Sequence, residues 1–127
     1  MKTIIKYPKQ FSKEFKDIII VLSKFSELKT INGLPIDTNL LSKSKDIENI
    51  LNQNNIYESY LRSHSSNLLF NIKILLIKNP KKQNCIEIGA ELFTKFNTNH
   101  SSNINFVFSI NFFKSFNNSC SEIIFGL

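Results

Sequence analysis

The sequence predicts one α/β domain in three layers, with a mixed sheet flanked by helices, and three observations carry this prediction. An apolar run at 72–77 is typical of a strand buried on both faces. An amphipathic helix is expected from Cys85, and an alternating strand at 104–110 follows it. This order favours a right-handed crossover between parallel strands. Strands also interleave with helices elsewhere in the chain, which favours the α/β class.

Strands are expected at three places in the N-terminal half. A short strand at 3–7 is closed by Pro8, and a charged connector follows at 11–16. The contiguous β-branched residues within 17–22 predict a strand at the centre of the sheet. A further edge strand is expected at 56–61.

One helix is expected between these strands, after a loop marked by Asn32 and Gly33. Ser44 is expected to cap the helix, and acidic residues follow in its first turn. Its apolar stripe consists of Ile47, Ile50 and Leu51. The helix is expected to fray within 52–55.

The central helix is expected to begin at Cys85, because Asn84 and Glu87 have the spacing of a capping box. Asn79 and Pro80 end the strand before it. Its core face is expected to contain Ile86, Ala90 and Phe93, flanked by Ile88, Leu92 and Phe96. Its solvent face is expected to contain Glu87, Glu91 and Lys95.

The C-terminal strand alternates along 104–110, which predicts one apolar and one mixed face. After it, Ser119 or Ser121 is expected to cap a helix of about one and a half turns, too short to be stable alone. Two interpretations of this end stay open: a frayed turn docked on the core, or the beginning of a segment that leads into another domain.

Length, composition and charge limit the class of protein. The chain has 127 residues, 42% of them hydrophobic, which suits one domain spanning residues 1–127. The formal net charge of +6 raises the possibility of nucleic acid as a partner. Arg62 is the only arginine in the sequence, which makes nucleic-acid binding less favoured. The densest basic group, expected to be a solvated loop, consists of Lys73, Lys78, Lys81 and Lys82.

No residues can be assigned to a catalytic, cofactor or metal site from the sequence. His64 and His100 lie in expected loops without a ligand at a metal-binding spacing. Asp46 and Glu48 diverge on their helix, and Glu87 and Glu91 lie on a solvent face. Cys85 and Cys120 are expected to be buried, reduced thiols, since neither belongs to a CxxC pair.

Two further features could bind a ligand or a partner. The turn at 79–84 precedes a helix N-terminus, which attracts anions, but it contains no glycine to let a phosphate approach the backbone. Phe112 and Phe113 cannot face the same way in a strand, so one of them is expected to mark an apolar partner surface. No stretch reaches the roughly 20 apolar residues of a membrane span, and a cytoplasmic protein is expected.

Several segments resemble the N-terminal domain of the leucyl, or cytosol, aminopeptidase family. DIIIVLSKF at 17–25 resembles that domain's first long strand, and the helix at 47–51 resembles the next helix. IKILLIKNPKK at 72–82 is similar to the family's strand and turn, and IEIGAELFTKF at 86–96 to its following helix. SEIIFGL at 121–127 is similar to the helix that leads towards the catalytic domain.

The resemblance implies a macro-domain-like fold and a non-catalytic assembly or regulatory role. It places peptide cleavage, with two divalent metals such as zinc or manganese, in a separate catalytic domain, so no catalytic or metal residue transfers to this chain. It implies as partners that catalytic domain and the neighbouring subunits of a homo-oligomeric hexamer. The alternative hypothesis is a stand-alone basic module that binds nucleic acid through 73–82. A third, an ADP-ribose binder, is suggested only by analogy of fold.

Overall fold

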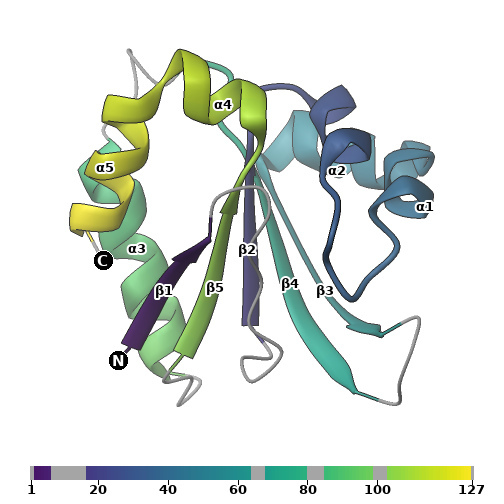
Figure 1. The fold of residues 1–127 in the computed structure, drawn as a ribbon, viewed down its shortest axis with the longest axis horizontal. Helices are drawn as coiled ribbons and strands as arrows, with labels where there is room; N and C mark the ends of the chain where they lie inside the picture. The colour runs from purple at the N-terminus through teal and green to yellow at the C-terminus, as the bar shows by residue number, and fades with distance from the viewer. Residues whose placement is uncertain (1, 7–16, 64–67, 80–84, 99–102, 127) are drawn as a thin grey trace.

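The computed structural model describes residues 2–6, 17–63, 68–79, 85–98 and 103–126, and its centre is a mixed sheet (Figure 1). The strand order within these ranges is β1-β5-β2-β4-β3. The strands are β1 (Lys2–Lys6), β2 (Asp17–Leu22), β3 (Ile56–Arg62), β4 (Leu69–Leu76) and β5 (Asn103–Phe108). Neighbouring strands run parallel, except that β3 is antiparallel to β4.

β2 is the central strand, as its β-branched sequence predicts. It pairs in parallel with β4 on one side and with β5 on the other, and its residues 18–22 are fully buried. Burial on both faces suits Ile and Val, whose branched side chains pack well on a pleated surface. After β4 the chain passes through α3 (Cys85–Thr98) and returns as β5. Because β2 lies between β4 and β5, this crossover passes over β2.

One face of the sheet is covered by η1 (Phe25–Thr30), α1 (Thr38–Ser42) and α2 (Lys45–Asn54). Ser44 caps α2 by accepting the Ile47 N–H, and Asn55 ends it with a left-handed φ of 64°. Ile50, predicted to lie on the core stripe, is exposed at the margin of the buried face. These helices and the segment between η1 and α1 contribute to this core Leu28, Ile31, Leu34, Ile36, Ile47 and Leu51.

The opposite face is covered by α3 (Cys85–Thr98), α4 (Ile110–Ser115) and α5 (Asn117–Gly126). Figure 1 shows α3 and α5 side by side against the half of the sheet that contains β1 and β5. This second core contains Ile19, Val21, Leu75, Ile77, Cys85, Phe106, Phe108, Phe112, Cys120 and Ile123. Helices on both faces of a mixed sheet confirm the three-layered α/β prediction.

The prediction for the C-terminal strand was wrong at its end. β5 stops at Phe108, because the Ser109 hydroxyl accepts the Phe112 N–H and caps α4. Ile110 therefore lies in a helix rather than in the strand. Asn105 and Val107 are buried as well as Phe106, so both faces of the strand lie within the protein.

The predicted core face of α3 was also wrong. Cys85 and Gly89 are buried, whereas Ile86 is 41% exposed and Ala90 is exposed. The physical reason is the neighbouring helix α5. Its Ser119 is hydrogen-bonded to the Cys85 thiol, and the small residues Cys85 and Gly89 let the two helices approach each other. The expected cap Asn84 lies outside the described residues, as do the side chains at 92–96.

The C-terminal helix is longer than the sequence predicted. α5 has ten residues and begins at Asn117, so Ser119 lies inside it and is buried, rather than capping it. Cys120 and Ile123 anchor the helix in the second core. Packing against α3 supplies the stability that an isolated helix of this length lacks. The connector expected at 11–16 lies outside the described residues.

Candidate functional site

A buried carboxylate lies where the central strands end. Glu27, in η1, is only 6% exposed. Ser23 directly follows β2, and Ser109 directly follows β5. Because β2 and β5 are parallel neighbours, these two serines lie at the same edge of the sheet, and η1 brings the Glu27 side chain between them.

Four hydrogen bonds occupy both oxygens of the Glu27 carboxylate. Oε1 accepts the Ser23 N–H and the Ser109 hydroxyl, each at 2.8 Å. Oε2 accepts the Ser23 hydroxyl at 2.5 Å and the Asn111 amide at 2.6 Å. The donors come from the ends of β2 and β5 and from α4. Glu27 therefore joins the end of β2 to the end of β5 and the start of α4, which lie more than 80 positions further along the sequence.

These hydrogen bonds also fix the charge of Glu27. Burial alone would raise its pKa, but the bonds from Ser23, Asn111 and Ser109 together hold the pKa of Glu27 below its ordinary value of 4.5. The carboxylate is therefore ionised at neutral pH, with both oxygens engaged by protein donors. This arrangement is suited to holding the edge of the sheet together, since an acid or base needs an oxygen accessible to a substrate proton.

Sequence reasoning missed Glu27. In the stretch FSELKT its carboxylate resembles that of an ordinary solvent-facing helix residue. The available signal was Ser23 and Ser109, which both directly follow strands with buried apolar residues. Two such serines at the ends of adjacent parallel strands place two hydroxyl donors close together, where they can bind a carboxylate.

An open hollow of about 460 Å³ lies beside this cluster. It is bordered by the segment after β2, the end of β4 and one side of α2, and its lining includes Ser23, Lys24, Glu48, Asn52 and Lys78. The chain leaves β2 over one face of the sheet and β4 over the other, so the hollow lies at a topological switch point.

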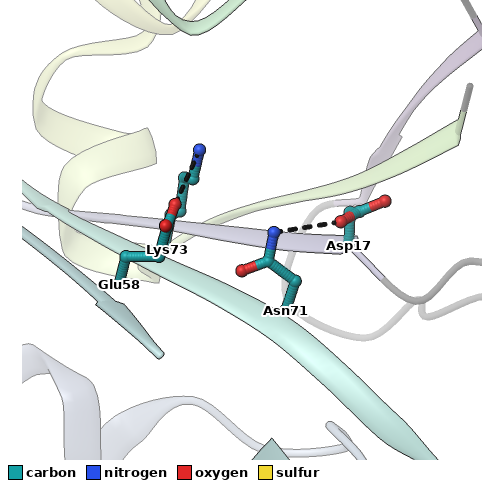
Figure 2. A network of polar contacts seen from close by, with 4 residues as sticks. All are labelled: Asp17, Glu58, Asn71 and Lys73. Atoms are coloured by element: carbon teal, nitrogen blue, oxygen red, sulfur yellow. Dashed lines mark hydrogen bonds and ion pairs between the residues drawn. The ribbon is translucent and has the colours of Figure 1, made fainter. Parts of the chain in front are cut away.

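A second polar group crosses the sheet from β2 to β3, and Figure 2 shows its four members. Lys73 of β4 is only 2% exposed, and its Nζ lies 2.8 Å from Oε2 of Glu58 on β3. The prediction that Lys73 belongs to a solvated basic loop was therefore wrong. The reason is that Lys73 lies inside a buried strand, where a lysine requires an acidic partner.

Next to this pair, the Asn71 amide donates to Asp17 at 3.3 Å (Figure 2). The Oδ1 atom of Asn71 is buried and accepts no hydrogen bond in the described structure. Such an atom destabilises the fold by roughly 1–3 kcal/mol. The group consists of one ion pair and one amide contact, and it is located across three adjacent strands.

β3 is one of the two outer strands of the sheet, and its successive residues direct their backbone N–H and C=O groups alternately towards β4 and away from it. Asn55 accepts the Leu76 N–H, and Ser63 donates to the Leu68 carbonyl. Directly opposed residues that exchange such bonds form the hydrogen-bonded pairs of an antiparallel ladder, and these pairs recur at every second residue. The odd-numbered residues of β3 therefore bond to β4, and the N–H and C=O groups of Glu58, Tyr60 and Arg62 are directed away from it.

Apolar side chains are exposed at this same edge. Tyr60 is 62% exposed, and Leu69 on β4 is 47% exposed. The register pairs Tyr60 with Asn71 and Arg62 with Leu69, so these side chains share the sheet face on which Glu58 meets Lys73. An edge strand with outward backbone groups and exposed apolar side chains is a surface that can pair with another strand.

The two cysteines lie buried between α3 and α5 and are not joined by a disulfide. Burial is the main cause that raises the pKa of Cys85, and burial raises the pKa of Cys120 to about 12. Both thiols are therefore protonated at neutral pH, as the prediction of buried, reduced cysteines requires.

The other predicted features are dispersed. Glu48 borders the hollow, and Glu87 and Glu91 are exposed on α3. His64, His100 and the turn residues 80–84 lie outside the described residues. Phe112 and Phe113 lie in α4 rather than in a strand, where Phe112 is buried in the second core and Phe113 packs against it partly buried; a partner surface at Phe113 stays a prediction.

No family model, no curated protein and no solved structure matches the chain, so any assignment of function has to be argued from the sequence and the structure. Within the described ranges, no three His, Cys, Asp or Glu side chains are grouped so that they could hold a metal ion. Among the helices of these ranges, none has the length and apolarity to cross a membrane.

Proposed function

We propose that this chain is the non-catalytic N-terminal assembly or regulatory domain of a cytosolic leucyl aminopeptidase, an enzyme that removes N-terminal residues from peptides, and that it supplies a binding surface for assembly. The β3 edge, which has no further strand beside it in the described ranges, is the observation that carries this proposal. There, Glu58, Tyr60 and Arg62 direct backbone donors and acceptors outward, beside the exposed Tyr60 and Leu69 side chains. Strand addition at such an edge derives affinity from main-chain hydrogen bonds and specificity from the alternating side chains.

The aminopeptidase part of the proposal derives from the resemblance of sequence segments. These segments lie on β2, α2, β4, α3 and α5, in the order of the family's domain. The peptide-cleaving site and its two divalent metals belong, on this proposal, to a catalytic domain outside these 127 residues. The partners are that domain and the neighbouring subunits of a homo-oligomer.

A photocrosslinking experiment tests the proposal. Benzoylphenylalanine replaces Tyr60, and the chain is irradiated in its source cells; the control carries the same group at Gln53, an exposed position on α2. We expect position 60 to crosslink to an aminopeptidase polypeptide identified by mass spectrometry, and position 53 not to do so. The purified chain with Mn²⁺ or Zn²⁺ should not hydrolyse leucine p-nitroanilide.

Two results would count against this function. Hydrolysis by the purified chain would show that it contains its own active site. Crosslinks from position 60 that never include an aminopeptidase would remove the proposed parent enzyme. The alternative nucleic-acid hypothesis remains a prediction, and a salt-sensitive gel shift with the purified chain would support it.

A further inference from the structure

The β3 edge also indicates one particular occupant, and this inference rests on the proposed role of that edge in assembly. Glu58 and Arg62 lie two residues before and two residues after Tyr60. All three share one face of the sheet and direct their backbone groups outward. An acid and a base placed symmetrically about a central residue make this edge complementary to itself.

We infer that β3 pairs with β3 of a second copy of this chain, antiparallel, with Tyr60 opposite Tyr60 on a two-fold axis. In this register Glu58 of each copy lies directly opposite Arg62 of the other, which gives two cross-strand ion pairs. The two tyrosines form an aromatic pair at the centre. An isologous contact of this kind closes after two copies and does not propagate.

The backbone supports the same register. Because the even-numbered residues direct their N–H and C=O groups outward, Tyr60 can exchange two hydrogen bonds with its equivalent. Glu58 and Arg62 of one copy can do the same with Arg62 and Glu58 of the other. A shift by one residue would oppose an outward residue to an inward one and lose these bonds.

Charge disfavours other symmetric registers. A two-fold axis at Glu58 would oppose two carboxylates, and an axis at Arg62 would oppose two guanidinium groups, both of which are unfavourable. Glu58 can serve two partners in the preferred register. Its Oε2 atom lies 2.8 Å from Lys73 within the chain, and its other oxygen is placed to accept from Arg62 of the second copy.

A proline substitution at position 60 tests pairing at the β3 edge without removing a hydrogen bond of the folded chain. The Tyr60 N–H is directed outward, so Tyr60→Pro removes a bond of the dimer and no bond to β4. Tyr60→Thr is the matched control, because it removes the ring and keeps the N–H. Arg62→Glu places Glu58 opposite a second carboxylate and should weaken the dimer about tenfold.

Sedimentation velocity over a range of protein concentrations tests the inference, with circular dichroism to confirm that each variant is folded. We expect a concentration-dependent dimer for the wild type, a monomer for Tyr60→Pro, and a weaker dimer for Tyr60→Thr. Glu58→Arg and Arg62→Glu should each dimerise poorly alone, and mixing the two should restore a dimer, since positions 58 and 62 of one copy then face opposite charges at positions 62 and 58 of the other.

A wild-type chain that is monomeric at every concentration would overturn self-pairing, as would a folded Tyr60→Pro variant that still dimerises. The two proposals fail separately. Crosslinks from position 60 to an aminopeptidase, with a monomeric wild type, would remove self-pairing and leave the assembly role. A dimer abolished by Tyr60→Pro, without such crosslinks, would remove the aminopeptidase and leave the self-pairing.

Discussion

Glu27 is expected to stabilise the carboxyl edge of the sheet, and replacing it measures how much. Glu27→Ala leaves four donors without their acceptor: the Ser23 N–H, the Ser23 and Ser109 hydroxyls, and the Asn111 amide. Hydrogen bonds to a charged group contribute roughly 1.5–3 kcal/mol each. Three of the four donors can rotate towards other acceptors, whereas the backbone N–H cannot. We therefore expect a loss of about 3–5 kcal/mol in the free energy of unfolding.

Glu27→Gln should cost less, about 1–2 kcal/mol. Its carbonyl can still accept the Ser23 N–H and the Ser109 hydroxyl. Its amide faces the Ser23 hydroxyl and the Asn111 side chain, and both of these can turn to accept. What is lost is mainly the charge that strengthens the bonds.

Urea unfolding at several pH values is the assay, with the exposed Glu91→Gln as control. Because the pKa of Glu27 is lowered in the folded state, its contribution is complete above the unfolded value of 4.5 and is lost as pH falls through the folded pKa. The difference between wild type and Glu27→Gln should therefore shrink below pH 4.5. Equal stabilities at pH 7, or a difference unaffected by acid, would refute this reasoning.

Three other predictions follow from the packing. Since burial raises the pKa of Cys85 and raises that of Cys120 to about 12, Ellman's reagent at pH 8 should react with the two cysteines only after denaturation; fast reaction in the folded state would contradict this. Gly33 has a φ of 84° and open space around its Cα, so Gly33→Ala should cost about 1 kcal/mol through the backbone alone, seen as a lower Tm. Lys73→Met should change the free energy of unfolding by less than about 1 kcal/mol, whereas Glu58→Gln, which removes the charge opposite a buried lysine, should cost about 1–2; urea unfolding that reverses this order would be the contrary result.

The strands were predictable because burial leaves a direct mark on composition. The β-branched residues of β2 and the apolar residues of β4 indicate central strands, and Ser44 shows where α2 begins. The face of α3 was not predictable, because it depends on contact with α5, and an apolar stripe can be drawn on either side of Ile86. The end of β5 depended on Ser109, whose hydroxyl could cap a helix or continue an alternating strand.

The polar sites were harder to predict, because their partners are distant in the sequence. In the sequence, Lys73 looks like part of a basic group, because Lys78 and two further lysines follow it closely. Its partner Glu58 is found only when β3 is aligned against β4. Glu27 depends on the ends of two strands, so its role is visible only once the strand order is known.

The position of β2 has a consequence for the order of folding. Both of its neighbours, β4 and β5, come later in the chain, and the bond from Ser109 to Glu27 joins residues 82 positions apart. During synthesis, the apolar segment at 18–22 must therefore wait for most of the domain to be translated before both of its edges are paired. Such non-local pairing slows folding and leaves a strand open to aggregation. A chaperone that binds short apolar segments would find its target here, in the nascent chain.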